Sequence, residues 1–270
     1  MSRISNCFAA LKAEKRGALI PYIEAFDPDY ETSRKLLAAM AAEGADLIEI
    51  GVPFSDPAAD GPTIQLAARR ALKAGANLPR ILEMVADFRK DNDRTPLILM
   101  GYLNPIEQFG TERFLQEAAK AGVDGLIIVD LPYEEAREIR ASAKEKGLDL
   151  IPLTAPNTPD DRLRMLLKDA SGFVYYVSIT GITGTRSANE EQLKEAMQRL
   201  RRATDLPIVT GFGISTPAQA KAASHISDGA VVASALIKEM VTTFEEDHAT
   251  EKTIPTVIHS LKKLIEAIRS

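Results

Sequence analysis

One short pattern recurs along this chain: helical sequence ends in a glycine, and an apolar run follows at once. The segments EGADLIEI, AGVDGLIIVD and KGLDLIPL are near copies of one another. A glycine in the left-handed conformation commonly ends a helix, and an uninterrupted apolar run behind it is typical of a strand covered on both faces. The repeated unit therefore predicts an α/β protein with a parallel sheet.

Eight apolar runs are expected to form strands, and they alternate with eight principal helices. The expected strands are 18–23, 47–52, 96–100, 125–129, 148–153, 173–178, 207–210 and 229–233. Eight units favour a closed (β/α)8 TIM barrel over an open doubly wound sheet. An extra N-terminal helix is expected over residues 3–15, and a short helix after the eighth strand. Because no linker or composition break interrupts the pattern, we expect residues 1–270 to form a single domain.

Charge and cysteine content narrow the classes of partner. The net charge is −5 with both signs interspersed, so the sequence offers neither a basic stripe for nucleic acid nor a polybasic patch for a membrane. Cys7 is the only cysteine, which excludes an intrachain disulfide and a four-thiolate metal site. The first residues carry charges where a signal peptide would be apolar, and no segment reaches about 18 apolar residues. We therefore expect a cytoplasmic protein that acts on small molecules or binds other proteins.

Two carboxylates fall at one strand-to-helix junction. Glu49 lies inside an apolar run, and alternation along a strand puts it on the same face as Leu47 and Gly51. Asp60 follows a loop rich in Pro, Asp and Gly, just before a helix that Pro62 can start. Active sites of such barrels lie at the C-terminal ends of the strands, so we expect both carboxylates to be catalytic. The alternative is a helix cap for Asp60 and a buried ion pair for Glu49.

Three small-residue segments at later strand ends predict a phosphate site. They are 182–184, 211–215 and 233–235, the last of which leads into the short helix. Exposed backbone N–H groups and a helix N-terminus both favour an anion, and the loops after strands 7 and 8 are the usual phosphate site of this fold. The residues expected to hold the phosphate are Gly184, Gly213, Ala233 and Ser234. For any one glycine, the alternative is an ordinary turn.

Several longer motifs carry a family resemblance. They are GVPFSDPAADGPTIQ from Gly51, DPD at 27–29, YLNP at 102–105, VYYVSITGITG at 174–184 and GFGIS at 211–215. With these motifs in this order, essentially the whole chain resembles the tryptophan synthase alpha subunit family. The resemblance implies retro-aldol cleavage of indole-3-glycerol phosphate to indole and glyceraldehyde 3-phosphate. It also implies a beta-subunit partner in an alpha2-beta2-type complex, with any pyridoxal phosphate (PLP) on the beta subunit and no cofactor on this chain.

The chemistry of the carboxylates agrees with that resemblance. A buried carboxylate has a raised pKa and can shuttle protons, which suits Glu49. Asp60 can accept the indole N–H and stabilise the cation that forms on the ring. Residues expected to line the substrate pocket are Tyr22, Leu99, Tyr102, Ile127, Leu153, Tyr175 and Thr183, with ordinary barrel packing as the alternative. The strand runs contain no lysine for a Schiff base, and the three histidines are not clustered for a metal.

The sequence departs from the family pattern near the expected site. Glu24 stands where the pattern has threonine, and Phe26 where it has glycine. Ala58 replaces a larger apolar residue, and Ala233 replaces a glycine. We expect Glu24 to face Asp60 and Phe26 to narrow or cover the pocket. An alternative hypothesis is therefore a barrel with changed or lost chemistry that acts on another substrate or mainly as an activating partner subunit.

Overall fold

The computed structural model describes residues 2–177, 186–211 and 213–270. Its strands are β1 (Ala18–Glu24), β2 (Ile48–Gly51), β3 (Leu97–Gly101), β4 (Gly125–Ile128), β5 (Asp149–Leu150), β6 (Leu153–Thr154), β7 (Val174–Val177), β8 (Ile208–Gly211) and β9 (Gly229–Val232). Its helices are α1 (Arg3–Ala13), α2 (Tyr30–Glu43), α3 (Pro62–Lys73), α4 (Leu78–Asp91), α5 (Leu103–Phe109), α6 (Thr111–Ala121), α7 (Arg137–Glu145), α8 (Asp160–Lys168), α9 (Arg186–Arg201), α10 (Pro217–Ile226), α11 (Ser234–Val241) and α12 (Thr253–Arg269). Within the described ranges, no helix has the length and apolarity needed to cross a membrane.

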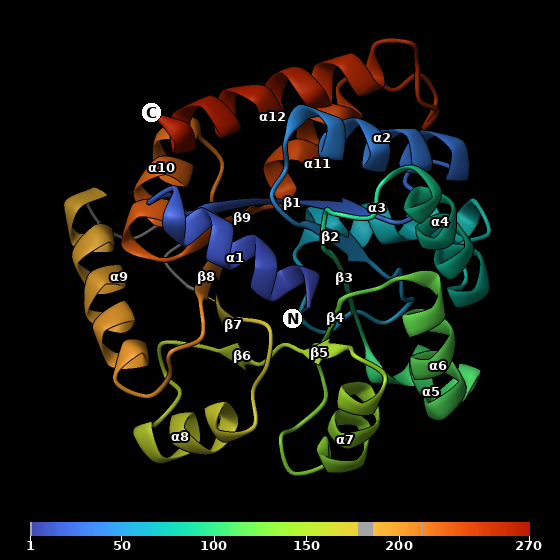
Figure 1. Ribbon diagram of the computed structural model, residues 1–270. Helices are drawn as coiled ribbons and strands as arrows, with labels where there is room; N and C mark the ends of the chain where they lie inside the picture. The colour runs from blue at the N-terminus through green and yellow to red at the C-terminus, as the bar shows by residue number, and fades with distance from the viewer. Residues whose placement is uncertain (1, 178–185, 212) are drawn as a thin grey trace.

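The strands form one parallel sheet that curls into a ring inside the helices (Figure 1). Its order is β5-β4-β3-β2-β1-β9-β8-β7-β6, and β5 and β6 together occupy the place of the expected strand 148–153. Around the break, Ile151 N donates to Leu126 O at 2.9 Å on one side, and Tyr175 N donates to Pro152 O at 3.0 Å on the other. Proline has no N–H for a strand ladder. The predicted barrel is therefore confirmed, with its fifth strand in two pieces.

Side chains alternate between the barrel interior and the layer under the helices. On β1, Ala18 and Ile20 belong to the interior cluster, whereas Leu19 and Ile23 belong to the cluster packed against the helices. The same alternation holds on the other strands because successive side chains point to opposite faces. This alternation decides which side chains can reach a site at the end of the barrel.

Helix α1 fills the N-terminal end of the barrel. Its buried residues Ile4, Phe8 and Leu11 pack into the interior cluster, and the rings of Phe8 and Phe173 are 5.7 Å apart. Figure 1 shows α1 lying across the middle of the ring. The opposite end, where the strands finish, remains for the candidate site.

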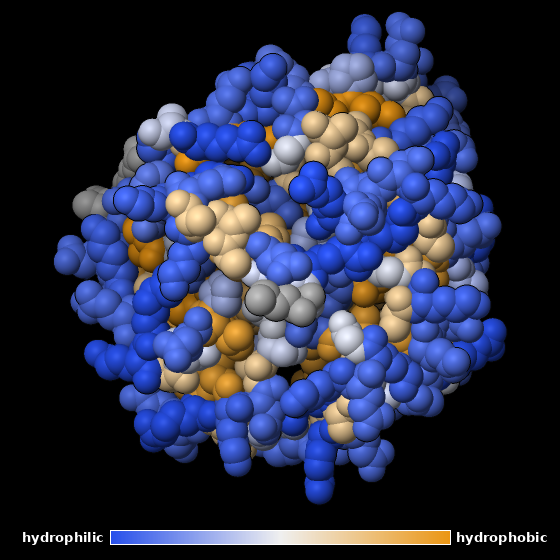
Figure 2. Space-filling model, viewed as in Figure 1, coloured by the Kyte–Doolittle hydropathy of each residue, from blue (hydrophilic) through white to orange (hydrophobic). Residues whose placement is uncertain are grey.

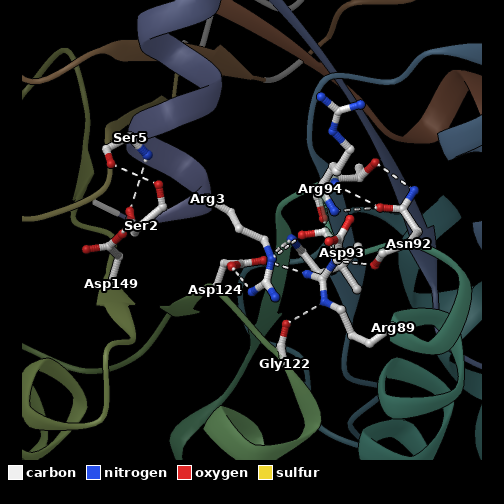
Figure 3. A network of polar contacts seen from close by, with 12 residues as sticks. Ser2, Arg3, Ser5, Arg89, Asn92, Asp93, Arg94, Gly122, Asp124 and Asp149 are labelled. Atoms are coloured by element: carbon white, nitrogen blue, oxygen red, sulfur yellow. Dashed lines mark hydrogen bonds and ion pairs between the residues drawn. The ribbon is translucent and has the colours of Figure 1, made fainter.

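A polar network ties α1 to the same N-terminal end. The buried carboxylate of Asp124 accepts from Arg89 Nη2 at 2.6 Å, Arg3 Nη1 at 3.0 Å and Leu97 N at 2.8 Å (Figure 3). Arg89 also donates to Gly122 O at 2.8 Å. Most residues on this face are hydrophilic, with small separated hydrophobic areas (Figure 2). The network therefore joins α1, α4, β3 and β4 beneath the barrel, far from the strand ends that carry Glu49.

Candidate active site

Glu49 lies on the interior face of β2, close to the strand's C-terminal end. Its side chain is only 2% exposed, and Tyr22 is its neighbour in register on β1. Oε1 of Glu49 has no hydrogen-bond partner among the described residues. Burial and then the negative charge of Asp60 raise the pKa of Glu49 to about 8. Among the described residues no cation pairs with Glu49, and a neighbouring cation would lower this pKa, so the alternative of a buried ion pair is not supported there.

Asp60 lies beside Tyr102 and does not cap α3. The N-cap of α3 is Gly61, with no side-chain bond to the helix. The hydroxyl of Tyr102, at the N-cap of α5, accepts from Ala59 N at 3.0 Å, directly beside Asp60. Burial raises the pKa of Asp60, and the nearby Tyr102 hydroxyl lowers it by less, so the net direction is upward. Tyr102, expected as a pocket wall, therefore also anchors the loop that carries the second carboxylate.

Glu24 is buried at the end of β1, on the same face as Tyr22. Its side chain is 3% exposed, and Tyr22 donates its hydroxyl proton to Glu24 Oε2 at 2.5 Å. Burial is the main reason that the pKa of Glu24 rises to about 8; the Tyr22 bond lowers it, and the charge of Asp60 raises it further. Glu24 thus lies within electrostatic reach of Asp60, as the sequence led us to expect.

Two glycines make room for tyrosine hydroxyls at the barrel mouth. A methyl group added to Gly51 would overlap the Tyr22 hydroxyl and lie 2.6 Å from Glu24 Oε2. A methyl group on Gly211 would overlap the hydroxyl of Tyr175 in the same way. Each tyrosine therefore leans over the neighbouring strand, and the lack of a side chain there allows the close approach.

The expectation for Phe26 is wrong. Its side chain is fully buried in the cluster between the strands and the helices. The ring packs edge-on against Tyr30 at 5.0 Å, and the Arg80 guanidinium lies 4.8 Å from its centroid. Phe26 has a φ of 71°, a conformation that favours glycine, which explains the glycine of the family pattern. Phe26 neither narrows nor covers the pocket, and Ala58 is exposed on its loop.

The predicted wall residues divide according to the strand face that carries them. Ile127, Leu153 and Tyr175 belong to the interior cluster, a position that fits a pocket wall and ordinary barrel packing equally well. Leu99 is wrong as a wall residue, because it belongs to the cluster under the helices. Its neighbour Met100 instead contacts both the interior cluster and the cluster around Tyr22. The alternation from Ile98 to Met100 would have identified the correct side chain from sequence.

Helices α3 and α11 pack against Tyr22 at the barrel mouth, and the sequence analysis did not predict these contacts. Tyr22 packs against Ala67 of α3 and Ile237 of α11, with Ile64 and Ala233 beside them. No strand pattern identifies these helix residues. Their signal would have been the apolar face that each helix turns toward the end of the barrel.

The described part of the expected phosphate site combines an open glycine with a helix N-terminus. Gly213 has a φ of 74° and open space where a side chain would be. Ala233 is the N-cap of α11 without a side-chain cap bond, and Ser234 begins the helix. The N–H groups of that first turn point beyond the helix end, where an anion is favoured. Thr183 and Gly184 lie outside the described residues.

Comparison with known proteins identifies one family along nearly the whole chain. Residues 8–266 match the family model described as tryptophan synthase alpha chain. The tryptophan synthase alpha chain of Gluconobacter oxydans is 62% identical and that of Granulibacter bethesdensis 61%, covering 100% of this chain and 100% and 97% of theirs. The crystal structure of tryptophan synthase subunit alpha from Legionella pneumophila superposes with a TM-score of 0.91 at 39% identity, covering 99% of this chain and 98% of that one. This chain belongs to the tryptophan synthase alpha chain family.

Membership in the tryptophan synthase alpha chain family confirms the resemblance drawn from the motifs. The TM-score also confirms the TIM barrel, since the match extends over nearly the full length. The hypothesis of changed or lost chemistry is not favoured, because relatives about 60% identical over the full length carry the same family name. Glu24 is therefore to be understood within the family's chemistry.

Proposed function

We propose that Glu49 and Asp60 are the catalytic acid–base pair of this tryptophan synthase alpha chain. The chain is a lyase of tryptophan biosynthesis that cleaves indole-3-glycerol phosphate to indole and glyceraldehyde 3-phosphate. One observation supports the assignment above all others. Glu49 is a buried carboxyl group whose Oε1 lacks a partner in the described structure, at the barrel end that also holds Asp60.

Charge determines which of the two groups starts with a proton. Asp60 is the less buried of the two, and the nearby Tyr102 hydroxyl favours its ionised form. Its negative charge helps to keep Glu49 protonated by raising the pKa of Glu49 to about 8. The proposed resting site pairs an ionised Asp60 with a neutral Glu49, as the reaction requires.

The cleavage can be written with Glu49 as a reversible proton carrier. Glu49 gives its proton to C3 of the indole ring, and the positive charge that appears on the ring nitrogen is stabilised by Asp60. The Glu49 carboxylate then takes the proton of the hydroxyl group on the carbon attached to the ring. That carbon becomes the aldehyde, and the electrons of the broken C–C bond return to the ring and neutralise it. Glu49 ends protonated, ready for another turnover.

The phosphate group is bound in this proposal by backbone donors. The first turn of α11, from Ala233 and Ser234, supplies N–H groups with the favourable end of the helix dipole. Gly213 adds a loop whose open side allows close approach of an anion. Backbone donors preserve the charge balance of the site, since they attract the phosphate without placing a cation near Glu49.

The family defines the setting of the reaction. The partner of an alpha chain is the beta subunit, which receives the indole and carries the pyridoxal phosphate, so the alpha reaction itself uses no cofactor. We further propose an alpha2-beta2-type complex and one domain spanning residues 1–270, since α12 packs against α2, α10 and α11 across the two ends of the chain. A cytoplasmic location belongs to the same proposal, because a phosphorylated substrate does not cross membranes freely.

The proposal is tested by replacing each carboxyl group with its amide. Glu49→Gln keeps the side-chain shape but cannot shuttle a proton, so indole release should fall by about a hundredfold to ten-thousandfold. Asp60→Asn should also lower kcat while the circular dichroism spectrum and Tm stay near those of the parent. Glu31→Gln on α2, whose carboxyl is exposed, is the matched control. Indole release by Glu49→Gln within about threefold of the parent would overturn the assignment.

A further inference from the structure

Glu24 is a third carboxyl group at the barrel mouth, and the acid–base mechanism leaves it without a role. It ends β1 on the interior face, two residues after Tyr22, and it accepts the short hydrogen bond from the Tyr22 hydroxyl. Its burial matches that of Glu49, at 3% and 2% exposure. A carboxyl group so far from water is costly unless it is neutral or paired.

The groups that face Glu24 do not supply a free positive charge. Asp60 and Asp27 are both negative and raise the pKa of Glu24. Arg70 of α3 lowers it, but the guanidinium is held by Asp27 through bonds of 2.7 and 2.8 Å. From α2, α11 and α12 the neighbouring side chains are apolar; they are Leu36, Met40, Leu236, Ile237, Met240 and Val257. These surroundings favour the neutral form of Glu24.

Tyr22 connects Glu24 to the catalytic strand. Tyr22 is in register with Glu49, and its hydroxyl lies against Gly51, two residues further along β2. The charges of Glu24, Asp60 and Glu49 all act on the Tyr22 hydroxyl. A change in the charge of Glu24 therefore acts on the Tyr22 hydroxyl, which lies beside the strand that carries Glu49.

We propose that Glu24 is a further positioning residue of this active site: its side chain holds Tyr22 against Gly51 beside Glu49, and the negative charge that appears when Glu24 loses its proton suppresses cleavage. The inference rests on the proposed roles of Glu49 and Asp60. The physical reason is the number of negative charges in one buried space. When Glu49 gives its proton to the substrate, a second carboxylate appears beside Asp60. If Glu24 were already ionised, the site would then contain three carboxylates, and their repulsion would oppose proton transfer from Glu49 to the substrate.

The predicted effect appears at alkaline pH. Burial and the neighbouring carboxylates raise the pKa values of both Glu24 and Glu49 to about 8, so both protons leave over the same range. In the parent, log kcat should then fall above this range with a slope approaching about −2, and in Glu24→Gln with a slope of about −1. One pH unit above the range, Glu24→Gln should retain about tenfold more of its neutral-pH kcat than the parent does.

The experiment measures kcat and KM for indole release from about pH 6 to 9.5 in the parent, Glu24→Gln, Tyr22→Phe and the control Glu31→Gln. Tyr22→Phe keeps the ring and removes the donor. Because the Tyr22 bond lowers the pKa of Glu24, its loss should move the alkaline decline to higher pH. Adding Tyr22→Phe to Glu24→Gln should produce no further movement, and Glu31→Gln should follow the parent.

A second measurement does not depend on activity. Carbon-13 NMR of labelled glutamate carboxyl groups should show two resonances that titrate near pH 8, one absent in Glu24→Gln and the other absent in Glu49→Gln. If Glu24→Gln does not fold, the pH profile of kcat in Tyr22→Phe and the carbon-13 titration of the parent test the role of Glu24 instead. An alkaline slope equal in parent and Glu24→Gln, or no Glu24 resonance titrating above pH 6, would overturn the role of Glu24. Full activity of Glu49→Gln would instead overturn the mechanism on which that role rests.

Discussion

At the scale of single residues, β2, the strand that carries Glu49, depends on the absence of a side chain at Gly51. Gly51 leaves space that the Tyr22 hydroxyl occupies, with Glu24 Oε2 directly beside it. Tyr22 cannot swing away at no cost, because it packs against Ala67 and Ile237. Glycine is therefore required at position 51 by a neighbour, although its own backbone conformation does not demand it.

Gly51→Ala tests this requirement. The added methyl group forces Tyr22 or the strand to move, and overpacking of this kind typically costs about 1–3 kcal/mol of the free energy of unfolding. We expect that loss in urea denaturation, together with lower kcat, because Glu49 is on the same short strand. Gly61→Ala is the control, since a methyl group there meets open space and should cost less than about 1 kcal/mol. Equal stability of the two variants would contradict the close packing.

At the scale of elements, α1 acts as the floor of the barrel. Phe8 contributes the largest apolar side chain of that floor, and it contacts Phe173 on the strand segment opposite. Phe8→Ala should lower the free energy of unfolding by about 3–5 kcal/mol, the usual range for a buried phenylalanine. Lys12→Ala, on the exposed side of the same helix, should change it by less than about 0.5 kcal/mol. A small effect of Phe8→Ala would mean that α1 covers the barrel without supporting it.

Elements with local signals could be predicted from the sequence, and those that depend on the assembled barrel could not. Helix α2 ends at Gly44, the glycine that precedes one of the repeated apolar runs. Asp29 and Asn77 cap the starts of α2 and α4, and such caps are local signals. Helix α5 was missed, because its start at Tyr102 has no side-chain cap bond. The contact of Tyr102 with the Asp60 loop is also set by the tertiary fold, since the two segments meet only when β2 and β3 pair.

At the scale of the whole molecule, the buried carboxyl groups of the mouth make stability depend on pH. Glu24 and Glu49 have pKa values of about 8 in the folded chain and ordinary values near 4.3 when unfolded. The folded state therefore holds more protons, and the stabilisation is complete below about pH 4 and is lost as pH rises toward 8.

The free energy of unfolding in urea should thus contain a contribution that decreases between about pH 5 and 8. Glu49→Gln and Glu24→Gln should each flatten that decrease, because an amide does not titrate. Glu31→Gln, with an exposed carboxyl, should keep the slope of the parent. If the parent and the double variant Glu24→Gln/Glu49→Gln showed the same pH dependence of the free energy of unfolding, neither group would be protonated in the folded chain.

The packing of α1 in the lower end of the barrel also determines where substrate and products enter and leave. Ile4, Phe8 and Leu11 close the lower end of the barrel, so substrate and products enter and leave at the end where the strands finish. A small molecule that lodges at this opening competes with the substrate by blocking its path, whatever its chemical likeness to it. Product must leave this opening before the next substrate can enter, which makes product release a candidate for the slow step of turnover.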